Sequence, residues 1–312
     1  MAVRTAVVGC GHFGRYHAQK YHELPGVELV AVVDRDEGVA GDLARELGAE
    51  ALCDASALAG RVDAASVVVP TEAHFQVVRD LLELDIHILV EKPIAASVEE
   101  GARLIELAAA RGRVLQVGHL ERFNAAILAL SDVLGEPMFI ESHRIAPFKP
   151  RGTDVDVILD LMIHDIDLIQ QLVRSPLARV DAVGVPVLSA RDDIANARLH
   201  FENGCVVNVT ASRVSLKSER KMRLFQREAY VSIDFLAREA TIARRGEGEM
   251  VPGVPDVRVE RRQFEPNDAL RLEIEAFLSA VRGEQAVAVT GEDGLRALDT
   301  ALRITRAMQR PT

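Results

Sequence analysis

Residues 5–14 read Thr-Ala-Val-Val-Gly-Cys-Gly-His-Phe-Gly, an apolar run that leads into a glycine turn. A helix-compatible stretch follows, and a second apolar run, residues 27–33, stops at Asp34. In a dinucleotide-binding turn the first glycine permits the tight bend, the second lets the backbone approach a pyrophosphate, and the third lets the helix lie close to the strand. The segment therefore predicts strand, turn, helix and strand around a dinucleotide. The three glycines are Gly9, Gly11 and Gly14.

The expected helix and the closing acid complete this cofactor site. The helix begins around His12 and Phe13 and points its positive end and free N–H groups at the phosphates. Asp34 stands where a carboxylate accepts a hydrogen bond from the ribose 2′-OH. Asp34 favours NAD by repelling the 2′-phosphate of NADP, although the adjacent Arg35 could accommodate that phosphate. The alternative, a glycine-rich turn without a ligand, would not explain why an acid closes the second strand.

Bulk properties limit the classes of function. The 312 residues suffice for two domains, and a content of 48% apolar and 27% charged residues is typical of a soluble globular protein. The net charge of −10 argues against a nucleic acid or an anionic membrane as partner. No apolar run is long enough to span a membrane, and the N-terminal one is too short for a signal peptide. Three cysteines without paired spacing predict a reducing compartment, the cytoplasm.

The first 118 residues alternate apolar, β-branched runs with amphipathic stretches. This alternation predicts a doubly wound parallel sheet with helices on both faces, forming a Rossmann domain over residues 1–118. Ser97 and Glu100 have the spacing of a helix capping box. The expected strands are residues 5–8, 27–33, 64–69, 86–90 and 114–117, and the expected helices are residues 12–24, 38–47, 72–84 and 98–111.

Residues 119–312 predict a second, α+β domain for substrate binding and oligomerisation. Its alternating segments predict a large, mostly antiparallel sheet, with one face covered by helices and the other left for a subunit contact. We therefore expect a homodimer or homotetramer. The last helix could pack back on the first domain. The expected helices are residues 155–174, 269–281 and 294–308, and the expected strands are residues 180–187, 195–201, 205–212, 221–226, 229–234 and 239–244.

Lys92 follows the expected strand 86–90, between Glu91 and Pro93. Ligands bind beyond the carboxyl ends of the strands in an open α/β sheet, so Glu91 and Lys92 should lie at the cofactor crevice. Its ammonium can donate a hydrogen bond to a substrate hydroxyl and stabilise a developing alkoxide. Pro93 restricts Lys92 to an extended backbone. The alternative is an exposed lysine paired with Glu91.

Asp160, His164 and Asp167 recur at i+4 and i+3 and so share one face of the expected helix. His164 can take a hydroxyl proton while a carboxylate orients its ring and supports the imidazolium. A structural histidine with solvent-facing or capping aspartates is one alternative. A metal-binding Asp–His pair is another, but no further His or Cys cluster accompanies it, and we predict no metal.

Three further groups of polar residues are candidates for binding. Those that end the third strand are expected to border the nicotinamide ribose or a phosphate: Pro70, Thr71 and His74, the last of which could equally cap a helix. Those that follow the fifth strand resemble the lining of a substrate site, although a domain linker would look similar: His119, Glu121, Arg122 and Asn124. Those in a proline-broken loop could meet a diphosphate or be scattered surface cations: Arg144, Lys149 and Arg151.

Taken in this order, the motifs resemble those of the Gfo/Idh/MocA oxidoreductases over nearly the whole chain. They are Gly9-x-Gly11-x-x-Gly14, Val69-Pro70-Thr71-x-x-His74, Glu91-Lys92-Pro93 and Asp160-x-x-x-His164. The resemblance implies an N-terminal NAD-binding Rossmann domain and hydride transfer between a sugar or cyclitol carbinol and the nicotinamide. It also implies a catalytic set in which His164 is the base and Lys92 binds the reacting hydroxyl. Asp160 would assist in substrate binding or tune His164.

A narrower resemblance concerns the substrate. Residues 119–124 and 160–167 are similar to those of family members that oxidise a nucleotide sugar such as UDP-N-acetylglucosamine at C3, before amination in the making of lipid A precursors. The chain departs from the common family pattern in lacking a glycine-rich run before Asp160, where residues 156–159 stand. Dehydrogenation of a free sugar or cyclitol is the alternative.

Two other classes remain open at this point. One is a hydrolase that uses NAD transiently to cleave a glycoside. The other is a cofactor sensor without enzymatic activity, which should have no need of Lys92, Asp160 and His164 together. The catalytic reading requires these three side chains to converge on one bound nicotinamide.

Overall fold

The computed structural model describes residues 2–148 and 156–309. It divides into two compact units, each of which is described by itself. The first unit comprises Met1–Leu120 and Asp268–Leu298, and the second comprises Glu121–Asn267 and Asp299–Thr312. The division of the chain into domains after residue 118 stays a prediction; the first compact unit also takes in a helix from late in the sequence.

The first unit contains a six-stranded parallel sheet with the order β3-β2-β1-β4-β5-β6. This is the strand order of dinucleotide-binding folds, and it reverses direction between β1 and β4, where the carboxyl ends of the strands leave room for a ligand. The predicted doubly wound sheet is confirmed, with a short edge strand, β3, in addition. The strands are β1 (Val3–Val8), β2 (Val27–Val33), β3 (Glu50–Leu52), β4 (Ala64–Val67), β5 (His87–Glu91) and β6 (Leu115–Gly118).

Helices on both faces of this sheet bury its apolar strands. α1 contacts α2 and α7, whereas α3 contacts α4. Because the crossovers are right-handed and the strand order reverses at β1, the two groups lie on opposite faces. Ile274 and Phe277 of α7 are buried in the same core as Tyr21 of α1. The helices are α1 (His12–Glu23), α2 (Glu37–Leu47), the 3-10 turn η1 (Ala55–Leu58), α3 (Thr71–Glu83), α4 (Val98–Arg111) and α7 (Ala269–Val281). The predicted cap is present, because Ser97 Oγ accepts a bond from the Glu100 N–H at 3.2 Å.

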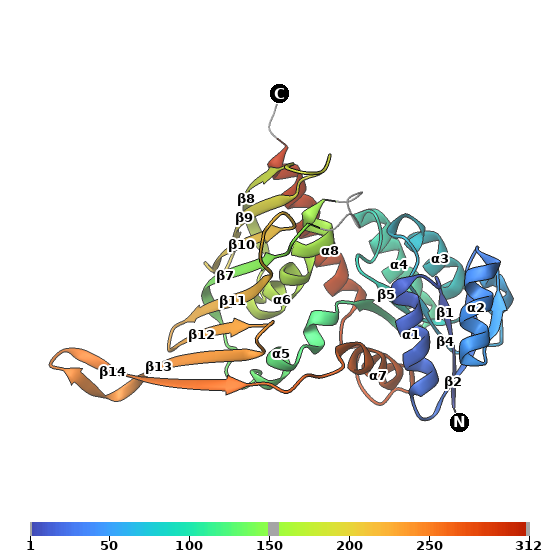
Figure 1. Cartoon of the computed structure of the whole chain (residues 1–312), viewed down its shortest axis with the longest axis horizontal. Helices are drawn as coiled ribbons and strands as arrows, with labels where there is room; N and C mark the ends of the chain where they lie inside the picture. The colour runs from blue at the N-terminus through green and yellow to red at the C-terminus, as the bar shows by residue number, and fades with distance from the viewer. Residues whose placement is uncertain (1, 149–155, 310–312) are drawn as a thin grey trace. The chain divides into compact units, whose positions relative to one another are not determined.

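The second unit is built on an eight-stranded sheet with the order β14-β13-β12-β11-β7-β10-β9-β8 (Figure 1). Its pairs are antiparallel except β7 with β10, which confirms the predicted, mostly antiparallel sheet. β7 and β14 were not predicted from the sequence. The strands are β7 (Pro137–Ile145), β8 (Leu177–Val185), β9 (Ile194–Phe201), β10 (Val206–Ser212), β11 (Glu219–Gln226), β12 (Ala229–Asp234), β13 (Glu239–Val251) and β14 (Val254–Gln263).

The remaining helical segments are short except for two. The single long helix expected from residue 155 is instead a π-helical turn, η3 (Ile158–Met162), that continues into α6 (Ile163–Val173), and Val155 itself lies outside the described residues. η3 contacts β10 and α6 contacts β7, so these helical segments cover the centre of the sheet. The other segments are η2 (Leu120–Phe123), α5 (Ala125–Ala129) and α8 (Gly291–Met308), whose residues are shared between the units.

The hairpin of β13 and β14 extends beyond its neighbours. β12 pairs with β13 only along Glu239–Arg244, so the distal part of the hairpin pairs only with itself. Figure 1 shows this ribbon projecting past the other strands. Among the described residues, no helix is both long enough and apolar enough to cross a membrane.

Candidate functional site

The glycine turn after β1 is shaped by two close backbone contacts and one open space. Gly9 has φ +98°, and a Cβ there would lie 2.4 Å from the Val68 carbonyl oxygen. A Cβ on Gly14 would lie 1.8 Å from the Gly9 carbonyl oxygen, so only glycine fits at either position. By contrast, no heavy atom of residues 2–148 and 156–309 lies within 4 Å of a Cβ built on Gly11. Protein packing leaves this space empty, and a pyrophosphate can approach the backbone there.

The first turn of α1 has donors for such an anion. Gly11 is the N-cap and supplies no side-chain cap, and the first turn carries no acidic residue. The N–H groups of this turn therefore face the phosphate position together with the positive end of the helix dipole. His12 and Phe13, both expected at the cofactor, are exposed here, and Phe13 is 59% exposed.

Asp34 links the end of β2 to the glycine turn. Its Oδ2 accepts a hydrogen bond from the Cys10 N–H at 2.7 Å, and its Oδ1 accepts one from the Asp36 N–H at 3.0 Å. A carboxylate has further lone pairs, so a ribose hydroxyl can be added to these bonds. Burial and the charge of Asp34 raise the pKa of the Cys10 thiol to about 12, which keeps it protonated. Arg35 is exposed beside Asp34. The residues of this turn thus fit NAD.

Lys92 lies at the carboxyl end of β5, half-buried, and the Lys92–Pro93 peptide bond is cis. The Glu91 carboxylate, expected at the cofactor, accepts a bond from the Lys92 N–H at 3.2 Å and faces His17 Nε2 at 3.3 Å. Burial alone would raise the pKa of Glu91, but His17 and Lys92 outweigh it and hold the pKa below its usual range. Glu91 is therefore an ionised carboxylate whose two oxygens contact His17 and the Lys92 N–H at the end of β5.

Pro70 and Thr71 lie at the start of α3, where Pro70 is exposed and Thr71 half-buried. His74 in the same helix is only 1% exposed. Its Nδ1 lies 2.8 Å from the Pro93 carbonyl oxygen, and its Nε2 lies 2.9 Å from that of Val69. Both ring nitrogens are used within the protein, so His74 holds the backbone at these two points, and its expected place at the cofactor stays a prediction.

In the second unit, Asp160 lies in the π-helical turn and His164 in the first turn of α6. Both side chains are half-buried, whereas the residues around them, Met162, Ile163 and Asp165, are buried. Single π-helical turns occur frequently at functional sites. Because the turn is not α-helical, the expected i+4 alignment of Asp160 and His164 along one α-helix does not describe their arrangement.

A buried ionic network holds α6 against β7. Arg144 is 3% exposed and donates from Nε to Asp165 Oδ2 at 2.6 Å and from Nη1 to Glu121 Oε1 at 2.9 Å. Ser142 Oγ donates to the same aspartate at 3.1 Å. Burial alone would lower the pKa of Arg144, but the two carboxylates raise it above its usual range. Arg144 is thus neither a surface cation nor presented to a diphosphate, as the sequence had allowed.

A cation that the sequence did not single out lies beside this network. Arg220 pairs with Arg144 in register across β7 and β11, and its Nη1 lies 3.5 Å from Glu121 Oε1. About half of its side chain, 48%, is exposed. Desolvation and the charge of Arg144 lower the pKa of Arg220 despite Glu121. No local sequence signal separates Arg220 from the other basic residues of residues 217–227.

The other expected substrate residues have structural contacts. Arg122 makes a bidentate pair with Asp167, with Nε–Oδ2 at 2.7 Å and Nη2–Oδ1 at 2.6 Å, and Asp167 is 1% exposed. Asn124 caps α5 by accepting a bond from the Ala126 N–H at 3.0 Å. His119 is 1% exposed. These contacts favour roles in shaping the fold. Arg151 and Lys149 lie outside the described residues.

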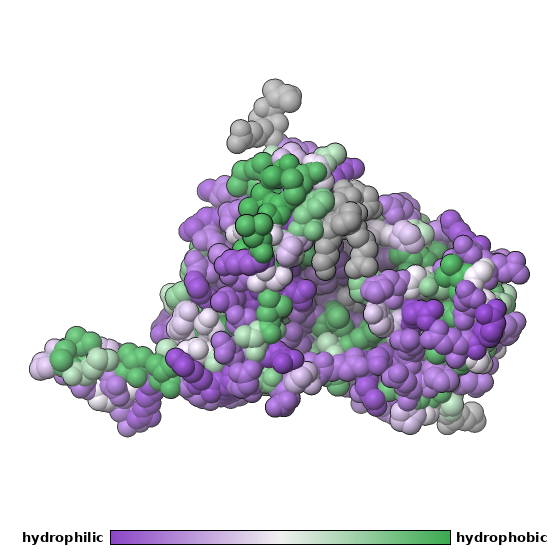
Figure 2. All heavy atoms as spheres, viewed as in Figure 1, coloured by the Kyte–Doolittle hydropathy of each residue, from purple (hydrophilic) through white to green (hydrophobic). Residues whose placement is uncertain are grey.

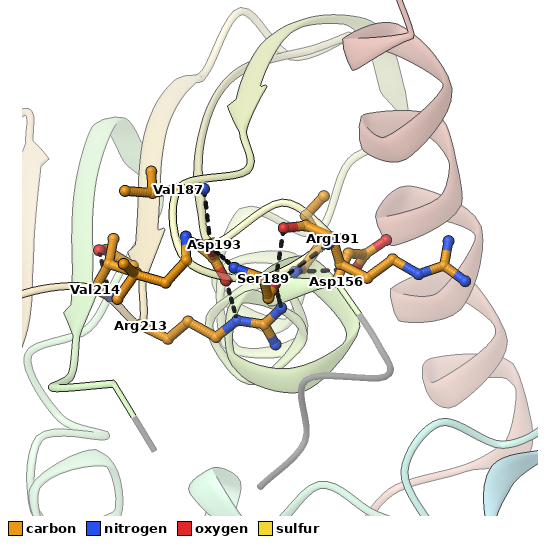
Figure 3. A network of polar contacts seen from close by, with 10 residues as sticks. Asp156, Val187, Ser189, Arg191, Asp193, Arg213 and Val214 are labelled. Atoms are coloured by element: carbon orange, nitrogen blue, oxygen red, sulfur yellow. Dashed lines mark hydrogen bonds and ion pairs between the residues drawn. The ribbon is translucent and has the colours of Figure 1, made fainter. Parts of the chain in front are cut away.

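A second polar network lies next to the segment that enters η3. Asp193 is fully buried and its Oδ2 accepts bonds from the N–H groups of residues 187–189 at 2.6–2.9 Å. Its Oδ1 accepts from Ser189 Oγ at 2.7 Å and Arg213 Nε at 2.9 Å (Figure 3). The neighbouring Asp192 carbonyl accepts the Val157 N–H at 3.1 Å. The network thus fixes the loop against which the helix of Asp160 begins.

Two family models cover most of the chain. Residues 3–119 match the oxidoreductase family with an NAD-binding Rossmann fold, and residues 126–232 match the GFO/IDH/MocA C-terminal domain. The chain belongs to the Gfo/Idh/MocA family. The predicted membership is thereby confirmed, and the chain is an oxidoreductase with NAD as cofactor. No group of three or more His, Cys, Asp or Glu within residues 2–148 and 156–309 is arranged to hold a metal.

The chain is similar along nearly its whole length to proteins with named activities. The chain is 42% identical over 308 residues, 98% of its length and 97% of the relative's, to UDP-N-acetylglucosamine 3-dehydrogenase of Acidithiobacillus ferrooxidans. A structure of UDP-N-acetylglucosamine 3-dehydrogenase GnnA from that organism matches with a TM-score of 0.93, covering 99% of this chain and all of the other. Identity to scyllo-inositol 2-dehydrogenase (NAD(+)) of Bacillus subtilis is 26%, over 98% of this chain and 94% of that one.

Proposed function

We propose that the protein oxidises the C3 hydroxyl of UDP-N-acetylglucosamine with NAD, forming a 3-keto nucleotide sugar and NADH. The observation that carries the proposal is the 42% identity, along 98% of the chain, to an enzyme named for this reaction. The intact glycine turn and Asp34 support the use of NAD in this chain. Residues 9–14 would hold the pyrophosphate of NAD and Asp34 its ribose, and the bound nicotinamide would supply the acceptor for the hydride of the sugar carbon.

The residues of this chain would divide the remaining chemistry among them. His164 takes the proton of the C3 hydroxyl as the C3 hydride leaves, so that the carbinol loses one proton and one hydride in total. Lys92 donates a hydrogen bond to the same oxygen and stabilises its developing negative charge. Asp160 assists by orienting His164 or the sugar. Arg220 supplies a half-exposed cation for the diphosphate, in place of the buried Arg144.

A comparison of substrates tests the proposal. Purified protein with NAD is expected to form NADH, which is measured by its absorbance. The kcat/KM with UDP-N-acetylglucosamine should be at least about 10²-fold above that with free N-acetylglucosamine or scyllo-inositol, because only the nucleotide sugar contacts the second unit through its diphosphate. Arg220→Ala is expected to raise KM for the nucleotide sugar alone. A higher kcat/KM with scyllo-inositol would assign the chain to the cyclitol dehydrogenases, and sugar release without net NADH would indicate the hydrolase.

We also propose that the protein is a homodimer or homotetramer assembled through the distal β13–β14 ribbon. A ribbon of two strands is marginally stable by itself in water, and exposed apolar patches mark interfaces. Figure 2 shows hydrophobic residues gathered on this ribbon. Its exposed apolar side chains are Met250, Val251, Val254 and Val257.

Charged residues at the ribbon are therefore expected to break the assembly. In light-scattering measurements, Val254→Glu with Val257→Glu should lower the molar mass to that of a single 34.1 kDa chain, because two carboxylates would be buried without partners. Val39→Glu, at an exposed apolar residue of α2, is the matched control and should leave the mass unchanged. A native protein that is monomeric at micromolar concentration would contradict the proposal.

The sparse, unpaired set of cysteines supports a reducing compartment, and we propose the cytoplasm.

A further inference from the structure

Two buried histidines contact the residues on either side of Lys92. His17 of α1 and His74 of α3 are each 1% exposed. His17 Nε2 faces the carboxylate of Glu91, the residue before the lysine, and His74 Nδ1 faces the carbonyl of Pro93, the residue after it. The short segment that carries the lysine is therefore fixed from both sides of the sheet.

The contact of His17 is part of a continuous hydrogen-bonded chain. Burial raises the pKa of Tyr21, so its hydroxyl keeps its proton, and it lies 2.8 Å from Ser66 Oγ. Ser66 Oγ in turn lies 3.1 Å from His17 Nδ1. Glu91 is a carboxylate and only accepts, so His17 donates from Nε2 and accepts at Nδ1 when it is neutral. Tyr21, Ser66 and His17 thus orient the Glu91 carboxylate, whose other oxygen accepts the Lys92 N–H.

The contact of His74 joins two strand ends. Val69 follows β4 and Pro93 follows β5, and both carbonyl oxygens lie within 2.9 Å of the ring. A neutral ring donates to one of these carbonyls and an imidazolium to both, so the ring holds the segment in either state. No apolar side chain of similar size can replace these bonds, because the carbonyls would be buried without a donor.

We propose that His17 and His74 are positioning residues, which fix the direction of the Lys92 side chain for hydrogen bonding to the reacting hydroxyl. This inference rests on the proposed function, in which Lys92 acts at that hydroxyl. A displacement of about 1 Å in such a group can cost on the order of 10²-fold in rate. The two histidines would therefore affect turnover without touching substrate or cofactor.

The first test follows Lys92 directly. The chain has five lysines, so reductive ¹³C-methylation gives few NMR resonances, which Lys→Arg variants assign. His17→Leu and His74→Leu are each expected to shift the Lys92 resonance and leave those of Lys20, Lys217 and Lys221 in place. His17→Gln and His74→Gln keep a donor and should restore it at least in part. His22→Leu, an exposed histidine of α1, is the matched control. An unmoved Lys92 resonance in both Leu variants overturns the proposal.

The second test is kinetic and separates the two proposals. Each Leu variant is expected to lower kcat on the nucleotide sugar about 10- to 100-fold with little change in KM for NAD. In a Lys92→Ala background the same substitution should have no further effect on kcat, because the effects of residues that act through one group are not additive. Equal losses with and without Lys92 would show a general structural role and overturn the positioning proposal. Full turnover by Lys92→Ala would instead refute the catalytic role of the lysine, while the NMR result would still report its placement.

Discussion

Replacement of His164 by alanine is expected to lower kcat by about 10²- to 10⁴-fold, the usual contribution of a general base. Without an imidazole at this position, the sugar hydroxyl would have to lose its proton to water as the hydride departs. KM for NAD and the affinity for NAD should stay near the native values, because the cofactor residues belong to the first unit, around Gly9 and Asp34. NADH formation under steady-state conditions and titration calorimetry with NAD measure the two quantities.

A matched control for this variant is His200→Ala. His200 lies on β9 of the second unit, as His164 does, and is partly exposed, with its Nε2 3.5 Å from Asp181 Oδ2. Its replacement should leave kcat within about twofold of the native value. Reduced NAD affinity in His164→Ala would indicate a perturbed fold. Near-native turnover by a folded His164→Ala protein would remove this residue from the reaction.

The first unit was largely predictable because its signals are local in sequence. Parallel strands covered on both faces read as continuous apolar runs, and the glycine spacing fixes the turn within a few residues. The strand missed there, β3, has three residues and is exposed at the sheet edge. The contacts of His17 escaped prediction, since its partners Ser66 and Glu91 are 49 and 74 residues away. A signal existed, however, because His17 lies one turn beyond Gly14 on the buried face of α1.

The second unit shows why buried polar networks are hard to predict. β7 is central in the sheet, yet its inward positions alternate from Ile140 to Ser142 and Arg144, which breaks the apolar pattern. Those polar side chains make sense only beside Asp165 and Glu121, which the sequence places more than twenty residues away. β14 was missed for the opposite reason, since both of its faces are largely exposed and show no alternation.

The same difficulty explains the errors in the candidate site. The motif residues could be named from spacing alone, but Arg144 was expected to be accessible because nothing in its neighbourhood reveals two carboxylate partners. The π-helical turn at Asp160 was also invisible, because its residues fit an α-helical pattern equally well. Asp156 accepts the N–H groups of Ile158 and Leu159 at 3.1 and 2.9 Å and so begins this segment. The spacing of residues in the sequence therefore shows which residues carry the chemistry more readily than it shows how they are arranged in space.

Two adjacent aspartates near this segment, Asp192 and Asp193, are expected to respond in opposite ways to replacement by asparagine. Burial alone would raise the pKa of Asp193, but bonds from Leu188, Ser189 and Arg213 outweigh it and hold the pKa well below its usual range. The pKa of Asp192 is instead raised, by burial and by repulsion from Asp156 and Asp193. At neutral pH the charge on Asp193 therefore stabilises the fold, whereas the charge on Asp192 opposes it.

Asp193→Asn is accordingly expected to lower the free energy of unfolding by about 3–5 kcal/mol at pH 7, because the amide cannot accept all of the N–H groups that converge on the carboxylate and Arg213 loses its buried partner. Asp192→Asn should be within about 0.5 kcal/mol of native or more stable. Urea unfolding at pH 7 measures the free energy of unfolding of both variants.

The sign of the pH dependence follows from the lowered pKa of Asp193. Its contribution to stability is complete above about pH 4, the pKa of the unfolded state, and is lost as the pH falls through the pKa of the folded state. The difference in the free energy of unfolding between the native protein and Asp193→Asn should therefore be constant from about pH 5 to about pH 8 and should narrow below about pH 4. Equal stability of the two variants at pH 7 would mean that the network around Asp193 does not hold the loop on which the Asp160 helix begins.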